Sequence, residues 1–193
     1  AAGGHNILMS GPPGTGKTML AQTLISLLPP PTLNECIEIS QIYSASGLSQ
    51  NSPFINHRPF RTPHHSSSSI AIIGGGSNPR PGEISLAHRG VLFLDEVPEF
   101  HRDVLEALRQ PIEHGQIHIA RAKKSLVLPA RFQLVAAMNP CPCGFYGTKK
   151  KPCVCTASDL SKYKRKISGP LIDRIDISLN VESIDYDKLS EAP

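Results

Sequence analysis

The sequence predicts an α/β fold in which helices cover both faces of a parallel sheet. A glycine-rich segment over 11–18 lies between an apolar run and a helical pattern, which is the setting of a phosphate-binding loop. An unbroken apolar run over 91–94 ends in two carboxylates, and a further apolar run over 132–137 leads to an asparagine. Continuous apolar runs are typical of strands buried in a parallel sheet. Polar residues after such strands lie at the sheet edge where ligands bind.

The composition is that of one folded domain. The chain has 193 residues, of which 39% are hydrophobic and 19% charged. No apolar run reaches the length of a membrane span and the first residues do not resemble a secretion signal, so we expect a cytoplasmic protein without a membrane partner. The net charge of +4 is compatible with an anionic partner and equally with an ordinary surface. Because the first strand begins at about His5, we expect 1–193 to be a single domain taken from a longer protein.

The phosphate-binding loop predicts a nucleoside triphosphate and Mg²⁺ as ligands. Its glycines let backbone N–H groups turn toward a polyphosphate, and the helix that follows adds its positive N-terminal end. The lysine of such a loop reaches the β and γ oxygens, and the hydroxyl after it ligates Mg²⁺. The alternative, a glycine-rich turn that matches by chance, is disfavoured by the flanking strand and helix. The loop consists of Gly11, Pro12, Pro13, Gly14, Thr15, Gly16, Lys17 and Thr18.

Two helices are expected after the loop. Leucines recur at helical spacing up to Leu28, where three prolines end the pattern, and their stripe should pack on the sheet. A weaker helical pattern over 33–48 is expected to serve packing, with Cys36 as a small core residue.

Residues 49–90 are rich in Pro, Ser, His and Gly, but 70–73 are too hydrophobic for a linker. We therefore expect a folded, looped insertion that carries a short strand or ribbon. The adjacent His64 and His65 are better explained as loop residues that cap or hydrogen-bond than as metal ligands.

The ends of the two core strands predict hydrolysis. Asp95 would hold the hydration shell of Mg²⁺, and Glu96 would orient and deprotonate the attacking water. Two acids after a strand are common by chance, but their position behind a phosphate loop favours the catalytic interpretation. Asn139 could hydrogen-bond the γ-phosphate or the water. Its alternative is an ordinary asparagine in a turn before proline.

A helix from His101 to about Gln110 should precede a β-hairpin over 116–128. The hairpin tip is basic, with Arg121, Lys123 and Lys124. A solvated turn commonly collects such residues, and a nucleic-acid contact is the other interpretation. His114 and His118 lie on either side of Gly115, which disfavours a helical metal pair.

Four of the five cysteines form two C-x-C pairs nine residues apart. Four thiolates match a tetrahedral Zn²⁺ site, and free thiols are the equally weighted alternative. Lysines 149–151 lie between the pairs, where they would offset the charge of a zinc–thiolate centre or contact a phosphate backbone. The four residues are Cys141, Cys143, Cys153 and Cys155.

Toward the C-terminus, 158–167 predicts a basic helix, and 169–176 a short helix that leads into a strand over 177–181. Arg174 lies at the turn before this strand, where it could be presented outward to a neighbouring subunit.

A phosphate loop, an acidic strand, a strand-end asparagine and a presented arginine, in this order, resemble the AAA+ ATPases. Within these the chain resembles the magnesium chelatase subunit I clade, in particular the competence protein ComM (YifB-type) subfamily. The resemblance covers nearly the whole chain and rests on five segments: 58–65, 74–88, 95–96, 138–144 and 168–176.

The resemblance implies a P-loop NTPase core in which 11–18 is Walker A, Asp95 and Glu96 are Walker B, and Asn139 is sensor 1. It implies that Arg174 is an arginine finger acting on a neighbour's site, with Arg165 a weaker candidate. Residues 60–88 would be the helix 2 insertion and 116–128 the pre-sensor 1 β-hairpin, which line the central pore in relatives that move on DNA.

Family members carry a Lon-like domain before the core and a helical lid with a sensor 2 arginine after it. Neither segment lies within 1–193, so we expect the C-terminal helical lid to be absent and this chain alone to bind nucleotide weakly and assemble poorly.

The implied function is Mg²⁺-dependent ATP hydrolysis by a homo-oligomeric, hexameric ring that moves DNA, as a branch-migration helicase in natural transformation. The alternative is a chaperone-like remodelling ATPase that acts on a protein partner, as in metal insertion into a porphyrin. A degenerate nucleotide-binding module is disfavoured, because the hydrolytic set is complete: Lys17, Thr18, Asp95, Glu96, Asn139 and Arg174.

Overall fold

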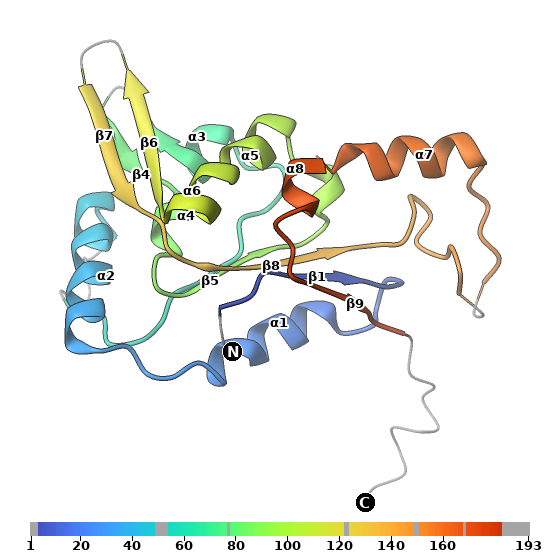
Figure 1. The fold of residues 1–193 in the computed structure, drawn as a ribbon, viewed down its shortest axis with the longest axis horizontal. Coiled ribbons are helices and arrows are strands. Elements are labelled where there is room, and N and C mark those ends of the chain that lie inside the picture. The colour runs from blue at the N-terminus through green and yellow to red at the C-terminus, as the bar shows by residue number, and fades with distance from the viewer. Residues whose placement is uncertain are drawn as a thin grey trace, which may run out of the picture.

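A five-stranded parallel sheet forms the centre of the molecule (Figure 1). The computed structural model describes residues 4–48, 54–76, 78–121, 124–148, 151–167 and 169–182. The strand order is β2-β5-β8-β1-β9, and every pairing in the sheet is parallel. The predicted α/β fold is therefore confirmed. The strands are β1 (Ile7–Ser10), β2 (Phe60–Arg61), β5 (Val91–Leu94), β8 (Gln133–Met138) and β9 (Ile177–Asn180).

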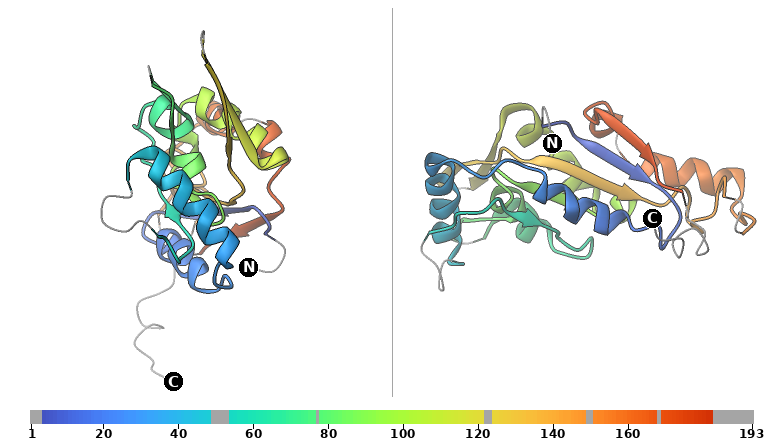
Figure 2. Two further views of the ribbon diagram at one scale, coloured as in Figure 1. Left: turned by 90° about the vertical axis from the view of Figure 1, so that its left-hand side faces the viewer. Right: turned by 90° about the horizontal axis from the view of Figure 1, so that it is seen from below.

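The central strands are buried on both faces, which explains their unbroken apolar sequences. Because side chains alternate along a strand, Leu92 and Leu94 face one hydrophobic cluster while Val91 and Phe93 face the other. All four of these side chains have 0% relative exposure. The larger cluster is covered by helices α3 to α5, and the smaller one by α1, so that helices cover both faces of the sheet (Figures 1 and 2).

The strand register places the three predicted polar strand ends at one edge. Ser10 pairs with Met138, and Leu94 pairs with Ala136, two residues earlier in β8. The phosphate loop, Asp95 and Asn139 each follow one of these strands, so they emerge beside one another.

The first two helices are α1 (Lys17–Ser26) and α2 (Leu33–Ser46). In α1 the predicted apolar stripe is only partly correct: Leu24 packs against the sheet, whereas Leu20 is 50% and Leu27 65% exposed. Helix α2 begins with a capping box, because Thr32 and Glu35 each bond the other's backbone N–H. Cys36 is buried in α2, which confirms its expected place in the core.

The insertion contains a short helix in addition to the expected strand or ribbon. Residues 70–73 lie in α3 (Ser69–Ile73), and Ser68 caps this helix by accepting a hydrogen bond from the N–H of Ala71 at 3.2 Å. Four consecutive apolar residues have no period that separates helix from strand, so their sequence did not predict this helix. A short ribbon does follow, formed by β3 (Gly74–Gly75) and β4 (Arg80–Pro81), and α4 (Glu83–Leu86) comes next.

After β5, a 3₁₀ turn (η1, Val97–Glu99) leads to two short helices, α5 (Arg102–Ala107) and α6 (Arg109–His114). The single expected helix is thus divided at Leu108. Pro111 explains the break, since its ring clashes with the carbonyl four residues earlier in a continuous helix.

The predicted hairpin is confirmed as β6 (Gln116–Arg121) and β7 (Lys124–Pro129), which pair antiparallel from Gln116↔Pro129 to Arg121↔Lys124. The predicted basic helix is α7 (Ala157–Lys166), and α8 (Gly169–Ile172) precedes β9. The hairpin and α7 lie at opposite ends of the long axis (Figure 1). Among the described helices, none is long and apolar enough to cross a lipid bilayer.

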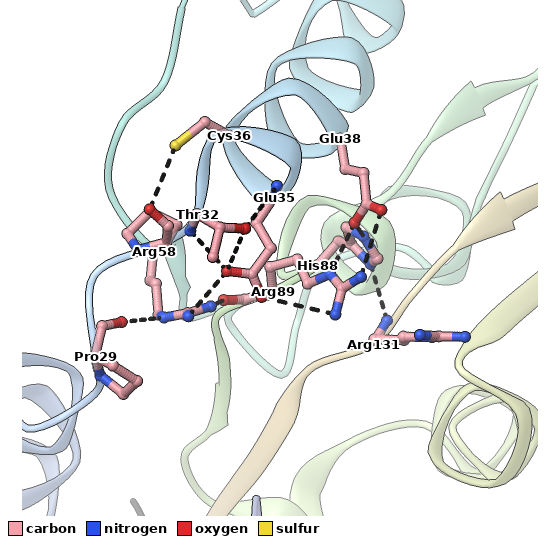
Figure 3. A network of polar contacts seen from close by, with 10 residues as sticks. Pro29, Thr32, Glu35, Cys36, Glu38, Arg58, His88, Arg89 and Arg131 are labelled. Atoms are coloured by element: carbon pink, nitrogen blue, oxygen red, sulfur yellow. Dashed lines mark hydrogen bonds and ion pairs between the residues drawn. The ribbon is translucent and has the colours of Figure 1, made fainter.

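A network of charged side chains ties α2 to the amino-terminal ends of the strands (Figure 3). Arg58, just before β2, donates hydrogen bonds to the carbonyls of Pro29 and Arg89 at 2.6 and 2.7 Å and to the Glu35 carboxylate at 3.2 Å. Arg89 adopts a left-handed conformation with φ of 61°, which its surroundings must hold in place.

Glu38 is the second acidic group of this network. It accepts hydrogen bonds from Arg89 Nε at 2.7 Å and from His88 Nε2 at 3.0 Å. His88 Nδ1 accepts a hydrogen bond from the N–H of Arg131 at 3.0 Å, so the neutral ring carries its proton on Nε2. The hydrogen bonds from Arg89 and then His88 lower the pKa of Glu38 to about 2, while burial lowers the pKa of His88.

We expect Glu38→Gln to lower the free energy of unfolding at pH 7 by about 1 kcal/mol, since 41% exposure screens the lost charge. A carboxylate whose folded pKa lies near 2, below its ordinary value of 4.5, stabilises the fold above pH 4.5 and loses that contribution as the pH falls toward 2. The difference between the variant and the unmodified chain should therefore shrink below pH 4.5. Denaturant unfolding followed by circular dichroism at pH 7, 4 and 3 measures it.

Glu106→Gln is the matched control, because Glu106 contacts only the surface Arg109 at 3.4 Å among the ion pairs described. This control should change stability by less than about 0.5 kcal/mol. An equal effect of Glu38→Gln at pH 7 and pH 3 would contradict the assignment.

Candidate functional site

The phosphate loop lies between β1 and α1, and its lysine folds back over it. Gly14 and Gly16 have φ values of 77° and 78°, which only glycine adopts without strain. Lys17 is 8% exposed, and its Nζ donates hydrogen bonds to the carbonyls of Gly11 at 2.8 Å and Pro12 at 2.9 Å. The same Nζ lies 3.4 Å from Asn139 Oδ1. Lys17 thus joins the loop to the end of β8.

Burial lowers the pKa of Lys17, and the carboxylates of Asp95 and Glu96 oppose this effect. A cation and two anions therefore face one another at the carboxyl edge of the sheet. This arrangement suits a ligand that brings both phosphate oxygens and a divalent cation.

Thr18 and Asp95 form the other half of this arrangement. Thr18 Oγ1 donates a hydrogen bond to Asp95 Oδ2 at 3.1 Å, and Asp95 Oδ1 accepts one from the N–H of Glu96 at 2.9 Å. A hydroxyl and a carboxylate oxygen at this separation are hard oxygen donors that fit Mg²⁺. The two residues expected to hold Mg²⁺ therefore lie within hydrogen-bond distance of each other.

Glu96 has an unusual backbone and an unexpected neighbour. Its φ of 54° is rare outside glycine, and its side chain is 55% exposed. His65 Nε2, from the loop after β2, lies 3.8 Å from Glu96 Oε2, and its ring packs edge-on against Phe100. Neither ring nitrogen of His65 has a hydrogen-bond partner among the described residues.

The neighbouring His64 behaves as expected for a loop histidine. Its Nδ1 lies 2.7 Å from Ser66 Oγ and 3.2 Å from the N–H of Ser66. The contact of His65 with Glu96 was not predicted from the sequence. A prediction that β2 pairs with β5 could have revealed this contact, because the pairing places the residues after Arg61 at the sheet edge where Glu96 lies.

Helix α7 closes the site behind Asn139. Tyr163 of this helix is 6% exposed, and burial first, then the nearby Glu99 carboxylate, raises the pKa of Tyr163 to about 12. A hydrogen bond with the backbone of Asn139 acts in the opposite direction. Tyr163 therefore packs an uncharged phenol against the turn that carries Asn139.

The four predicted zinc ligands converge. Cys141 Sγ lies 3.3 Å from Cys143 Sγ and 3.7 Å from Cys153 Sγ, and Cys143 and Cys153 are 3.6 Å apart. All four sulfurs, with that of Cys155, lie within 4.8 Å of one another. In a tetrahedral site with metal–sulfur bonds of about 2.3 Å the sulfurs are about 3.8 Å apart, so this donor set fits zinc.

The structure alters the expected setting of Arg174. Arg174 follows α8 and forms an ion pair with Glu113 of α6 in the same chain, and its side chain is 23% exposed. Arg174 was expected to be presented outward to a neighbouring subunit, whereas here its guanidinium pairs with an acid of its own chain. Arg165, the weaker finger candidate, lies exposed in the last turn of α7.

The structure describes the basic hairpin up to the last strand pair before its tip. Arg121 and Lys124 are backbone partners at the closed end of the hairpin. Lys123 lies outside the described residues, as do Lys149 and Lys150 between the cysteine pairs. In the described part of the chain, the four cysteines are the only group of three or more potential ligands with metal-binding geometry.

Comparison with known proteins gives one family. A family model described as magnesium chelatase, subunit ChlI, matches residues 1–189. The chain is 54% identical over 182 residues to competence protein ComM of Haemophilus influenzae, and 53% identical over 182 residues to the uncharacterized protein YifB of Salmonella typhimurium. It is 26% identical over 149 residues to the magnesium-chelatase 38 kDa subunit of Cereibacter sphaeroides.

The ComM and YifB alignments each cover 94% of this chain and 35% of the relative. The alignment to the magnesium-chelatase subunit covers 69% of this chain and 45% of that protein. The chain therefore spans about a third of the length of its ComM and YifB relatives.

Proposed function

The chain belongs to the magnesium chelatase subunit ChlI family of AAA+ proteins, and from this premise we propose that it is the ATPase core of a ring-forming motor that acts on DNA. The observation that carries the proposal is the convergence at one sheet edge of Lys17 with Asn139 and of Thr18 with Asp95. These contacts join three strands that are distant in sequence into one polyphosphate and Mg²⁺ site.

Each residue of this site has a role in phosphoryl transfer to water. Lys17 would bind the β and γ oxygens. Thr18 and Asp95 would hold Mg²⁺, which would neutralise charge on the phosphate. Glu96 orients the attacking water and takes its proton, and its exposed carboxylate is open to that water. Asn139 donates its amide N–H to the γ-phosphate or to the water. Gly11 to Gly16 line the site, and the backbone N–H groups of Gly14, Thr15 and Gly16 are its donors, because Pro12 and Pro13 carry no N–H and the N–H of Gly11 donates to the Met138 carbonyl at 3.2 Å.

Arg174 completes the site of a neighbouring subunit in this proposal. Its partner Glu113 lies on α6, so the ion pair must open when Arg174 reaches a γ-phosphate across the interface. A homo-oligomeric, hexameric ring supplies such an interface for each subunit. We further propose that residues 1–193 form one domain of a longer cytoplasmic protein.

The proposed DNA contact rests on the β6–β7 hairpin and its basic tip. The hairpin pairs only with itself and extends away from the main sheet (Figure 2). A projecting hairpin with Arg121, Lys123 and Lys124 suits a phosphate backbone in the pore of a ring. The ComM relative is named a competence protein, which supports branch migration of DNA during natural transformation as the process.

A second candidate function is remodelling of a protein partner. It is supported by the similarity to a magnesium-chelatase subunit over 69% of this chain. In this case the ring would hydrolyse ATP at a rate that DNA leaves unchanged.

We propose Zn²⁺ as a structural cofactor, held by Cys141, Cys143, Cys153 and Cys155. The sulfur separations of 3.3 to 3.7 Å support it. Thiolate ligands without an open position are typical of structural zinc.

We expect Glu96→Gln in the full-length protein to lower the ATP hydrolysis rate by about 100-fold or more, because the general base is lost. ATP binding should persist, since Lys17, Thr18 and Asp95 are unchanged. Phosphate release and binding of a fluorescent ATP analogue measure the two effects. Glu106→Gln on α5 is the control and should keep the rate, whereas an unchanged rate in Glu96→Gln would exclude Glu96 as the base.

Arg174→Ala should retain nucleotide binding and lose hydrolysis in the full-length ring. Mixing it with Lys17→Ala subunits should restore part of the activity, because a bound nucleotide on one subunit then meets Arg174 of its neighbour. Glu113→Gln removes the same ion pair and should remain active, which separates the finger role from a structural one. Mixed rings as inactive as either variant alone would contradict action across the interface.

Charge reversal at the hairpin tip (Arg121→Glu, Lys123→Glu, Lys124→Glu) should abolish stimulation of the ATPase by branched DNA and leave the basal rate unchanged. Lys162→Glu with Lys164→Glu on the exposed face of α7 is the matched control and should retain stimulation. If the tip variant is still stimulated, the pore assignment is wrong. If DNA never stimulates the unmodified protein, the remodelling function is favoured.

A further inference from the structure

The segment that carries the four cysteines touches the phosphate loop. This cysteine loop, 141–155, begins two residues after Asn139, and its first member, Cys141, has 0% exposure. A Cβ placed on Gly144 would lie 2.9 Å from Pro13 Cδ and 3.4 Å from Pro13 Cγ. The backbone of the cysteine loop therefore lies against the side chain of Pro13 with no space for a methyl group.

Apart from the cysteines, the described residues of the cysteine loop are held by local contacts: Thr148 Oγ1 donates hydrogen bonds to the carbonyls of Phe145 at 3.0 Å and Lys151 at 3.4 Å. The part of it that the structure describes contains no helix or strand. A segment of this length without regular structure needs another source of order within a compact domain. Its first turn instead wraps around one sulfur, because the N–H of Tyr146 donates a hydrogen bond to Cys141 Sγ at 3.3 Å and that of Gly144 to the Cys141 carbonyl at 3.0 Å.

A bound metal would supply the missing order, since metal ligation contributes directly to folding free energy. It would join the two ends of the cysteine loop, because Cys141 and Cys143 lie at one end and Cys153 and Cys155 at the other. Lys151 lies between these ends in the sequence, and its Nζ lies 5.5 Å from the centre of the Phe145 ring, inside the cysteine loop.

The same end of the molecule contains two nucleotide-site residues. Pro13 is part of the phosphate loop whose carbonyls hold Lys17. Asn139 is separated from Cys141 in the sequence by Pro140 alone, and its Oδ1 lies 3.4 Å from Lys17 Nζ. A fixed cysteine loop thus constrains the phosphate loop from outside and Asn139 along the chain.

We propose that zinc bound by the four cysteines braces Pro13 and Asn139, so that nucleotide affinity depends on metal occupancy. The metal contacts no nucleotide and takes no part in hydrolysis. Gly144 is the positioning residue that transmits the constraint, because it permits the close approach to Pro13. This inference rests on the proposed ATP site and adds a structural requirement to it.

The test uses the full-length protein and two separate readouts: zinc per chain by elemental analysis, and the dissociation constant of a fluorescent ADP analogue. The unmodified protein should contain one zinc per chain, and cobalt substitution should give the absorption bands of a tetrathiolate site. Chelation under reducing conditions should weaken ADP binding by about tenfold or more, which corresponds to about 1.4 kcal/mol. Stoichiometric Zn²⁺ should restore it.

Two variants separate the metal from the brace. Cys155→Ser should lose both zinc and tight ADP binding, while Cys36→Ser, which changes a buried cysteine of α2 outside the cluster, should retain both. Gly144→Ala keeps all four ligands and should retain zinc, yet weaken ADP binding, because its methyl group pushes on Pro13. Gly147→Ala is its control, since that glycine also has a positive φ, of 76°, but a Cβ there meets no atom within 4 Å.

The outcomes are distinct. A zinc-free protein from a reduced, never-chelated preparation would overturn the metal site. Bound zinc with unchanged ADP affinity after chelation and in Gly144→Ala would overturn the brace and leave the ATP site intact. A zinc-loaded protein that binds no nucleotide would contradict the proposed function, and the brace with it.

Discussion

The buried ammonium of Lys17 imposes the strictest constraint on this structure. A charged group that is 8% exposed must have polar partners, because desolvation of an unpaired charge is costly. Its partners are two carbonyls of the loop that precedes it and the amide of Asn139, with two carboxylates nearby. These groups come from β1, β5 and β8, so the parallel register of the three strands is a condition for burying this lysine.

Two segments outside the main sheet extend this site. The loop after β2 places His65 beside Glu96, and the cysteine loop places Gly144 against Pro13. Both contacts fall on residues proposed to handle the nucleotide or the water. A structural change in either segment can therefore affect the site through a single contact, that of His65 with Glu96 or that of Gly144 with Pro13. This proximity is the physical basis for relating the insertion and the metal centre to hydrolysis.

At the opposite edge of the sheet, where the strands begin, hydrogen bonds and ion pairs between charged side chains connect α2 to the strands. Glu38 receives hydrogen bonds from Arg89 and His88, and Arg58 spans from Pro29 to Arg89. These contacts anchor α2 and hold Arg89 in its left-handed conformation. These contacts therefore lie on α2, just before β2 and just before β5, the elements that flank the insertion.

The sequence by itself determined the α/β fold class, the central strands and the positions of the polar residues that follow them. Strands β5 and β8 were predictable because burial on both faces requires continuous apolar runs. The places of four polar residues were predictable too, because each follows a segment with a recognisable local pattern: Lys17 and Thr18 end the glycine-rich loop, and Asp95 and Asn139 follow apolar strands. Tertiary structure decided the rest. Whether Ile70 to Ile73 formed a helix or a strand depended on packing of Ile72 and on the Ser68 cap. The ion pair of Arg174 with Glu113, the approach of His65 to Glu96 and the convergence of four sulfurs join residues far apart in the chain. Local periodicity carries no information on such pairs, because they exist only after the strands have fixed the positions of the connecting loops.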